Sequence, residues 1–491
     1  MSSTAPARPR AVLLGVQLSG VADRDFTSSL DELARLATTL GFEVVGRVVQ
    51  RRARMAPGAV VGSGKLRELA RWTGGTGVVP LGPRAAGARR RDESDDEDDA
   101  RGDEPRHEEL EAGDANRDDD GEREDDADDT GEGPDDDAPP ATIVLVDHDL
   151  TPSQARNLER ATGVEVLDRT AVILAIFQRH ARSREARLQV EIARLEYIAP
   201  RLRETGLGRD RQGGGIGGRG AGESASELDR RKVRDRIAEL RSELASIERE
   251  DATRRRRREG VSTVALVGYT NAGKSSWMRA LTGSGVLVED KLFATLGTTV
   301  RVLEHAGAHR ILVSDTVGFI KHLPHDLVAS FRSTLDEARE CDLLVHVVDA
   351  SDPAHESQLA VTTDVLASIG ADEAPRLLVL NKADKLDELS RARVRAAHPD
   401  ALLVSARRAE DVATLRERIV AHFERDMEEA ELVVPYALQR VVAQAHATAH
   451  VLREEHDAEG TRIRVRASAQ ALARLRSELA AAAASGRPAD R

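Results

Sequence analysis

The sequence contains one cysteine, few aromatic residues and no long apolar run. Cys341 is the single thiol among 491 residues, and aromatic side chains make up 2% of the chain. One thiol excludes an intramolecular disulfide framework and suits a reducing compartment. No apolar stretch approaches the ~20 residues of a membrane span. Residues 11–16 are apolar but end at Gln17, which indicates a strand rather than a signal segment. We therefore expect a cytosolic protein without a membrane span.

Acidic residues are concentrated in one segment that hides the charge of the rest. The formal net charge is −13. Residues 91–140 hold 26 Asp and Glu against 5 Arg, which leaves 67 Lys and Arg against 59 Asp and Glu elsewhere. Such a segment cannot bury enough apolar surface to fold, so we expect a disordered acidic insertion at 86–140. Its role stays open between solubility, competition with RNA for basic surfaces, and passive insertion in a loop.

A glycine-rich segment between an apolar run and a helical pattern is the most informative motif. Residues 264–267 are apolar, residues 268–275 spell GYTNAGKS, and a helical pattern follows. Strand, loop and helix in this order indicate a P-loop, whose backbone N–H groups surround phosphates. Lys274 would contact the phosphates and take part in catalysis, and the Ser275 hydroxyl would bind Mg²⁺. The predicted nucleotide contacts of this loop are Gly268, Tyr269, Thr270, Asn271, Ala272, Gly273, Lys274 and Ser275.

Three further polar segments each follow an apolar strand pattern, in the order required by a guanine-nucleotide switch. Asp315 would hold Mg²⁺ through water, and the Gly318 N–H would touch the γ-phosphate during catalysis. The Asp384 carboxylate can accept two hydrogen bonds that guanine offers and adenine does not. Residues 405–407 would contact the base carbonyl. These patterns predict GTP as the substrate. The assigned contacts are Asp315, Thr316, Val317, Gly318, Asn381, Lys382, Ala383, Asp384, Ser405, Ala406 and Arg407.

The segment 292–301 lies where a threonine should close over Mg²⁺ and the γ-phosphate. Spacing alone leaves Thr295, Thr298 and Thr299 as competing candidates. A β-rich surface strand without a ligand is the alternative for this segment.

Two residues bear on how the attacking water is ordered. Phe319 stands where many switch GTPases place a glutamine that orients this water. Phenylalanine cannot make that hydrogen bond, so we expect Phe319 to pack against the sheet and intrinsic hydrolysis to be slow. Asn271 has two interpretations, a ligand of a monovalent cation such as K⁺ or a turn residue that tolerates left-handed geometry.

The first 180 residues show strand patterns that alternate with helix patterns. Strands near 43–49, 141–146 and 164–167 alternate with helices near 26–40 and 152–162, which predicts an N-terminal α/β domain over 1–180. Thr151 and Pro152 fit a helix cap and first helical position. Residues 61–66 imitate a P-loop but have alanine at position 59, where the first glycine belongs.

Two charged helices flank a glycine-rich and arginine-rich tip at 211–223. Ile237, Leu240, Leu244 and Ile247 give the second helix an apolar side, which predicts an antiparallel helical hairpin over 181–259. Arg211, the tip glycines and the arginine run 254–258 favour backbone and shape contacts to structured RNA. The scarcity of aromatic residues argues against stacking on single-stranded bases.

We expect a P-loop GTPase domain over 260–426, with a mostly parallel sheet, and a small α+β appendage over 427–491. The appendage contains an apolar run that ends at Pro435, and it should hold a helix near 436–453, a hairpin-like segment at 460–465 and an alanine-rich last helix. The fold class is therefore α/β and multidomain.

The chain resembles the HflX family of ribosome-associated GTPases, a group of TRAFAC-class P-loop proteins. The resemblance lies outside the general GTPase motifs, in residues 43–46, 61–65, 150–158, 168–177, 187–191, 200–202, 223, 228–231 and 292–296. It implies that Thr295 is the Mg²⁺ ligand and a catalytic residue, with Phe293, Ala294, Leu296 and Gly297 beside the nucleotide. The family usually has Asp-Pro after Phe-Ala-Thr-Leu, where this chain has Gly297 and Thr298.

The resemblance further implies a cytosolic monomer that binds GTP and GDP with Mg²⁺ and docks on the large ribosomal subunit and its rRNA. A fraction would reach membranes through ribosomes. GTP-bound protein would separate stalled or idle ribosomes, notably under stress. Two alternatives remain: a scaffold that binds ribosomes whatever the nucleotide, and an RNA-remodelling NTPase. Cys341 looks buried, so no second catalytic centre is indicated.

Overall fold

The computed structural model describes residues 8–79, 138–205, 225–256, 261–283, 292–293, 299–304, 310–321, 332–425 and 427–484. The core of the acidic insertion and the glycine-rich tip therefore lie outside the described residues. The chain forms two compact units, one from residues 1–21 and 42–168 and the other from residues 22–41 and 169–491. No described helix has both the length and the apolar character that crossing a bilayer requires.

The first unit is built on a parallel sheet with the strand order β2-β1-β3-β4. Its central strand β1 is apolar almost throughout and is buried at seven consecutive positions, as expected for a strand covered on both faces. The strands are β1 (Arg10–Leu18), β2 (Glu43–Arg52), β3 (Ile143–Val146) and β4 (Glu165–Asp168).

Helices α2 (Ser63–Thr73) and α4 (Pro152–Thr162) complete this unit, and both contribute leucines to its core. The predicted start of α4 is confirmed. The Thr151 hydroxyl accepts a hydrogen bond from the Gln154 N–H, the Thr151 N–H donates to Gln154 Oε1, and Pro152 is the first helical residue. This capping box satisfies two backbone donors that the helix cannot satisfy itself.

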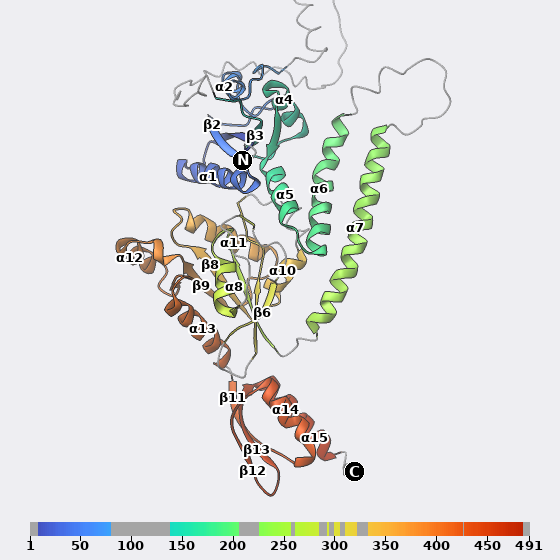
Figure 1. The fold of residues 1–491 in the computed structure, drawn as a ribbon, viewed down its shortest axis with the longest axis vertical. Coiled ribbons are helices and arrows are strands. Elements are labelled where there is room, and N and C mark those ends of the chain that lie inside the picture. Colours follow the sequence, from blue (N-terminus) through green and yellow to red (C-terminus); the bar gives the residue numbers. More distant parts are fainter. Residues whose placement is uncertain are drawn as a thin grey trace, which may run out of the picture. The chain divides into compact units, whose positions relative to one another are not determined.

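The second unit begins with helix α1 (Asp23–Leu40), which packs on α5 (Arg169–His180). Next come α6 (Arg184–Thr205) and α7 (Ala225–Arg256), which lie side by side in Figure 1. Leu188 and Ile192 of α6 pack on Leu240 of α7, with Ile237, Leu244 and Ile247 beside them. Arg184 of α6 bonds Glu243 of α7, and Glu191 of α6 bonds Arg236 of α7. The later residue of α6 thus meets the earlier residue of α7, so the two helices run in opposite directions. The predicted antiparallel pairing of the two helices is confirmed.

A six-stranded sheet with the order β10-β9-β8-β5-β7-β6 forms the next part of the second unit. All neighbours are parallel except β6, which is antiparallel to β7. This sheet confirms the expected α/β class with a mostly parallel GTPase sheet. The strands are β5 (Ser262–Gly268), β6 (Thr299–Val302), β7 (Ile311–Asp315), β8 (Leu343–Asp349), β9 (Arg376–Asn381) and β10 (Leu402–Leu403).

Helices cover both faces of this sheet. One face packs on α8 and α13 through Trp277, Leu281 and Leu415, and the other packs on α10 and α11 through Leu335 and Leu366. Burial on both faces explains why the strands are continuous apolar runs. The helices are α8 (Lys274–Thr282), α10 (Arg332–Arg339), α11 (His355–Ser368), α12 (Glu388–Ala397) and α13 (Ala409–Glu424).

The last part of the chain is a three-stranded antiparallel sheet with two helices. Helix α14 (Gln439–Thr448) ends earlier than the predicted helix near 436–453, because β12 begins at His450. Pairing of β12 with β13 outweighs the local helical preference of residues 450–453, a tertiary effect that sequence periodicity cannot report. The elements are β11 (Met427–Val434), β12 (His450–His456), β13 (Thr461–Ser468) and α15 (Ala469–Ala484).

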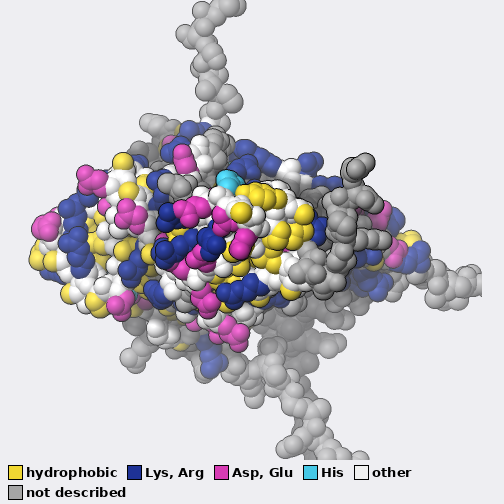
Figure 2. Space-filling model, turned by 90° about the horizontal axis from the view of Figure 1, so that it is seen from below, with side chains coloured by type: hydrophobic (Ala, Val, Ile, Leu, Met, Phe, Trp, Pro, Cys, Tyr) yellow, Lys and Arg dark blue, Asp and Glu magenta, His cyan; other side chains and the backbone are white. Residues whose placement is uncertain are grey.

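The charged side chains of this sheet pair across its strands. Glu429 of β11 bonds both Arg464 and Arg466 of β13, and Glu431 bonds Arg462. Figure 2 shows a face on which Lys and Arg side chains are interspersed with Asp and Glu side chains. Alternating signs of this kind keep a sheet surface soluble and contribute little stability pair by pair.

Candidate nucleotide-binding site

The four predicted motifs follow strands β5, β7, β9 and β10 of one sheet. These strands are parallel to one another or to a shared neighbour, so their carboxyl ends meet at the same edge. Ligands of open α/β sheets bind outside this edge, where loops from neighbouring strands converge. The fold therefore brings together residues that lie as far apart in the sequence as Gly268 and Arg407.

Backbone geometry explains the two glycines of the P-loop. Gly268 has φ 149°, and a Cβ there would lie 2.1 Å from the Val347 carbonyl oxygen of the neighbouring strand β8. Gly273 has φ 100°, and a Cβ there would lie 2.2 Å from Asn381 Nδ2. Left-handed backbone and this close approach leave room for hydrogen only. Helix α8 has no side-chain cap at its start, so its first N–H groups face the loop.

Lys274 is held inside the loop rather than in solvent. Its side chain is buried, and Nζ donates to the carbonyl oxygens of Gly268 at 2.9 Å and Tyr269 at 2.8 Å. Burial lowers the pKa of Lys274 from 10.5 to about 8, while nearby Asp315 opposes that shift. An ammonium with so little solvent would gain strongly from an anion, because charges interact more strongly where water is excluded.

Oxygen ligands of the kind that Mg²⁺ prefers lie next to this lysine. The Ser275 hydroxyl donates to Asp315 Oδ2 at 2.7 Å, and Asp315 is fully buried at the end of β7. Thr316 turns inward and bonds the Leu266 carbonyl at 2.8 Å, which fixes the direction of the chain after Asp315. A hydroxyl and a carboxylate side by side fit Mg²⁺, which takes hard oxygen ligands and keeps several waters.

Gly318 and Phe319 follow this aspartate. A Cβ at Gly318 would lie 2.9 Å from Thr270 Cα and 3.0 Å from Lys274 Nζ, so the backbone runs directly against the P-loop. Phe319 packs with Val267, Leu335 and Leu344 in the core on the α10 and α11 face. The expectation that Phe319 packs against the sheet is confirmed, and its ring is not available to touch a water at the site.

The residues predicted to select the base form one hydrogen-bonded cluster. Asn381 donates from Nδ2 to the Ala272 carbonyl at 2.7 Å and accepts the Ala406 N–H at 3.2 Å. The Ser405 hydroxyl donates to Asp384 Oδ1 at 2.6 Å, and Arg407 lies 3.7 Å from the other oxygen of Asp384. Desolvation is the largest single effect and opposes ionisation of Asp384, but the hydrogen bond from Ser405, a backbone hydrogen bond and the charges of nearby arginines together outweigh it, so the pKa is lowered.

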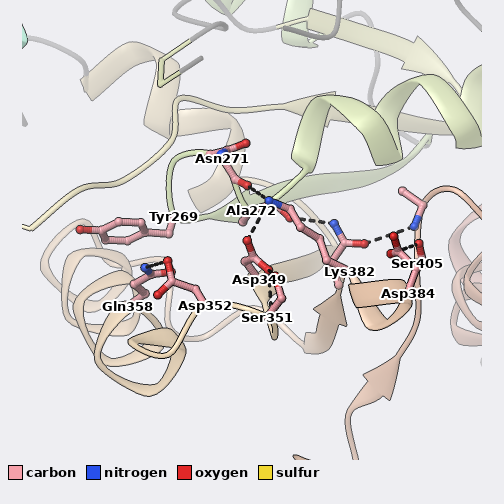
Figure 3. Close-up of polar contacts among 12 residues, drawn as sticks. Tyr269, Asn271, Ala272, Asp349, Ser351, Asp352, Gln358, Lys382, Asp384 and Ser405 are labelled. Carbon is pink, nitrogen blue, oxygen red and sulfur yellow. Dashed lines mark hydrogen bonds and ion pairs between the residues drawn. The ribbon is translucent and has the colours of Figure 1, made fainter. Parts of the chain in front are cut away.

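Lys382 connects the base segment to the P-loop in a way that the sequence did not suggest. Figure 3 shows it between Asn271 and Asp349, with Nζ 2.8 Å from the Asn271 carbonyl oxygen and 2.7 Å from Asp349 Oδ2. Asp349 is the last residue of β8, which lies between the strands that carry the predicted motifs. Asp349 was not predicted from the sequence, although its position at the end of an apolar strand could have indicated that it belongs to the site. Asn271 has φ 59°, the left-handed conformation that asparagine tolerates in turns.

Comparison with known proteins covers almost the whole chain. Three family models match it: a GTP-binding GTPase N-terminal region at 27–79 and 137–178, a GTP-binding GTPase middle region at 180–258, and a 50S ribosome-binding GTPase at 263–382. The GTPase HflX of Gluconacetobacter diazotrophicus is 54% identical over 484 residues, which are 97% of this chain and 99% of that protein. The chain belongs to the HflX family of GTPases.

One further relative and one solved structure are also similar to this chain. The GTPase HflX of Magnetococcus marinus is 36% identical over 482 residues, which cover 98% of this chain and 97% of that protein. A crystal structure of a GTP-binding protein from Sulfolobus solfataricus in complex with GDP is 20% identical, with a TM-score of 0.40, over 84% of this chain and 97% of that one.

The segment that the HflX resemblance assigns to Mg²⁺ is only partly described. Ala294, Thr295, Leu296, Gly297 and Thr298 lie outside the described residues, and Thr299 begins β6 opposite Asp315 of β7. Phe293 has φ 58° and is buried, with its ring 4.6 Å from Phe177 of α5 in an edge-to-face arrangement. This ring contact ties the start of the segment to helix α5, which precedes the whole GTPase sheet in the sequence, and no local pattern predicts such a contact.

Proposed function

We propose that this member of the HflX family of GTPases is a nucleotide-dependent switch that acts on the large ribosomal subunit. It binds GTP at the carboxyl edge of the β10-to-β6 sheet and hydrolyses it to GDP and phosphate. One observation carries the proposal. Lys274, the Ser275–Asp315 pair and the Ser405–Asp384 pair, which are suited to phosphate, Mg²⁺ and guanine respectively, meet at this edge.

The chemistry follows from these placements. In-line attack of water on the γ-phosphate spreads negative charge over its oxygens, and Lys274 would leave its two carbonyl partners to neutralise that charge. The Gly318 N–H, held against the P-loop, would donate to the γ-phosphate. Ser275 and Thr295 would hold Mg²⁺, which supplies further neutralisation when bound. K⁺ beside Asn271 is a separate expectation, tested by exchanging K⁺ for Na⁺ in the assay.

Guanine selection is assigned to Asp384, because its carboxylate is ionised and fixed by Ser405. Asp384→Asn turns one acceptor oxygen into a donor, so GTP affinity should fall about a hundredfold or more, with xanthosine triphosphate bound better. Equilibrium binding of both nucleotides measures this. Asp387→Asn is the matched control, since Asp387 caps α12 through the Ser390 N–H and should leave guanine preference intact. Unchanged guanine specificity in Asp384→Asn would remove the assigned role.

Association with the large subunit is supported by the description of the family model over 263–382, a 50S ribosome-binding GTPase. The helical pair α6 and α7 adds a surface with many arginines, among them Arg184, Arg236 and Arg241, whose ion pairs are partly exposed. Such pairs are weak in water and can exchange a carboxylate for an RNA phosphate. Helping to split or rescue stalled ribosomes in the cytosol under stress is the activity we propose for this association.

Cosedimentation with large subunits in GTP, GDP and a nonhydrolysable analogue tests the switch. We expect binding with GTP and the analogue, weaker binding with GDP, and loss of this difference in Lys274→Ala. A multiple-turnover assay should also show that large subunits accelerate hydrolysis, because buried Phe319 cannot order the attacking water. Equal binding in all three nucleotide states would instead favour a scaffold, and absence of acceleration would contradict activation by the ribosome.

A further inference from the structure

The side chain of Tyr269, at the first turn of the P-loop, points away from Asn271 and Lys382 (Figure 3) and enters a buried hydrogen-bonded cluster. Its centre is the hydroxyl of Tyr269, whose side chain is almost fully buried. The hydroxyl donates to Glu32 Oε2 at 2.7 Å and accepts the backbone N–H of Lys321 at 2.6 Å. Tyr269 therefore joins the P-loop, helix α1 and the segment that follows Gly318.

Glu32 is itself held firmly. Its other oxygen, Oε1, pairs with Arg169 at the start of α5 at 2.8 Å, and both side chains are at most 3% exposed. Arg169 also donates to the Ser29 hydroxyl of α1 at 3.3 Å. A buried carboxylate persists only where partners satisfy it, so Arg169 and Tyr269 fix its position. Burial raises the pKa of Tyr269 well above 10, with Glu32 adding to the effect, so the hydroxyl stays neutral and keeps its donor.

Residues 319–321, the described part of the segment after Gly318, contact the P-loop at three points. Thr270 N–H donates to the Phe319 carbonyl at 2.7 Å, and Phe319 N–H donates to the Gly268 carbonyl at 3.2 Å. The third point is the Tyr269 hydroxyl on Lys321 N–H, and it is the one made by a side chain. This segment starts one residue after Gly318, whose N–H is assigned to the γ-phosphate under the proposed function.

Helix α1 approaches the same region at other positions. Asp25 lies 3.9 Å from Lys321 Nζ, and Arg35 lies 3.6 Å from Asp352 after β8. Arg24 donates to the Pro353 carbonyl. All of these residues belong to the second compact unit. Glu32 therefore acts from a helix that already rests on the GTPase part, rather than from a loose segment.

We propose that Tyr269 and Glu32 are positioning residues for GTP hydrolysis, which hold residues 319–321 against the P-loop and thereby hold the Gly318 N–H toward the γ-phosphate. The inference rests on the proposed function and deepens it. The sequence assigned Tyr269 to the nucleotide together with the rest of its loop, but its hydroxyl bonds Glu32 and the Lys321 N–H instead, so we expect the pair to act on the rate after GTP is bound and not on binding itself. Release of the Lys321 N–H leaves a part-buried donor without its partner, which favours opening of this segment.

Tyr269→Phe tests this, because it removes the hydroxyl and keeps the ring. We expect kcat to fall about tenfold while KM for GTP changes less than about twofold, since an interaction needed after binding lowers kcat rather than affinity. Hydrogen exchange at the Lys321 amide should rise about tenfold or more. Tyr436→Phe is the matched control, because it also loses one hydroxyl bond, to the Asp457 carbonyl in the C-terminal sheet, and should change neither reading.

Glu32→Gln is the second variant, since an amide oxygen can still accept from Tyr269 while the charge that pairs with Arg169 is lost. Its effect on kcat should be smaller, and the double variant should be no worse than Tyr269→Phe alone, because both act through one bond. Unchanged Lys321 exchange in Tyr269→Phe would overturn the proposal whatever the rates. Increased exchange with an unchanged kcat, or additive effects in the double variant, would also overturn it. A wild-type protein that hydrolyses no GTP would refute the proposed function, whereas the exchange result would still report on the contact.

Discussion

Two lysines of this molecule follow a glycine at or near the start of a helix, yet only one of them is placed for phosphate. Lys274 opens α8 in the second unit and bonds two carbonyl oxygens of its own loop. Lys65 lies in the first turn of α2 in the first unit and pairs with Glu68, 2.7 Å away on the same helix. The sequences around them, AGKS and SGKL, look alike.

The difference lies in the backbone before each lysine. Gly273 takes a left-handed conformation, and so do Gly268 and Asn271 earlier in the same loop. Gly62 at the start of α2 is extended, with φ −71°, and its N–H is already used by Gln50 Oε1 at 2.9 Å. A phosphate site thus needs free N–H groups and a desolvated cation together. Glycine and lysine in succession do not supply them.

The largest expected effect comes from exchanging each lysine for alanine. Lys274→Ala removes the cation that neutralises the phosphates, so GTP hydrolysis should fall about 10²- to 10³-fold, as when other fixed charge-stabilising groups are lost. Lys65→Ala removes a surface ion pair and should leave the rate within about twofold. Steady-state phosphate release measures both. A comparable loss of hydrolysis rate in the two variants would show that the two lysines do not differ in function.

The next largest difference is expected between alanine substitutions of the two glycines, Gly273 and Gly62. Gly273→Ala forces a left-handed alanine against Asn381, which should lower the free energy of unfolding by about 1–3 kcal/mol. Gly62→Ala meets only the ends of Arg52 and Gln50, so a change within about 0.5 kcal/mol is expected. Urea titrations followed by tryptophan fluorescence measure both changes. In a Trp72→Phe background, the fluorescence of Trp277 reports unfolding of the GTPase core. In a Trp277→Phe background, the fluorescence of Trp72 reports unfolding of the first unit. Similar losses at both glycines would contradict the geometric argument.

A smaller effect should appear as a pH dependence of stability. In nucleotide-free protein the pKa of Lys274 is about 8, against an ordinary 10.5, chiefly because of burial. Between these values the unfolded chain binds a proton that the folded chain has released, so the free energy of unfolding rises with pH. The gain, at most about 3 kcal/mol, should be absent in Lys274→Met. Urea titrations at pH 7.5 and 9.5 check this, and equal pH slopes in the two proteins would show that Lys274 is not desolvated.

Much of the nucleotide site could be predicted from the sequence, because each motif directly follows an apolar strand. Parallel strands place their carboxyl ends together, so Gly268, Asp315, Asn381 and Ser405 converge once the strands are recognised. The α4 cap at Thr151 was predictable for a similar reason, since a capping box acts over three residues. Sequence patterns are therefore enough to predict a contact where the two partners are neighbours in the sequence or lie at the ends of recognisable parallel strands.

Contacts between distant segments could not be predicted in this way. Glu32 reaches Tyr269 across 237 positions, and Phe177 meets Phe293 from another helix. Neither pair can be recognised from the periodicity of the sequence, because each residue also fits the pattern of its own helix or loop without its partner. The strand β12 was mistaken for the end of a helix on the same grounds, since its pairing with β13 is decided by a later part of the chain.

Burial of the lone thiol has a practical consequence for experiments on this protein. Cys341 is 8% exposed, its Sγ bonds the Ala338 carbonyl, and burial raises its pKa to about 12. Maleimides react with thiolates, so the natural chain should give almost no fluorescent background at neutral pH. Cysteines introduced on exposed positions of α1 and α12 would therefore accept dyes selectively.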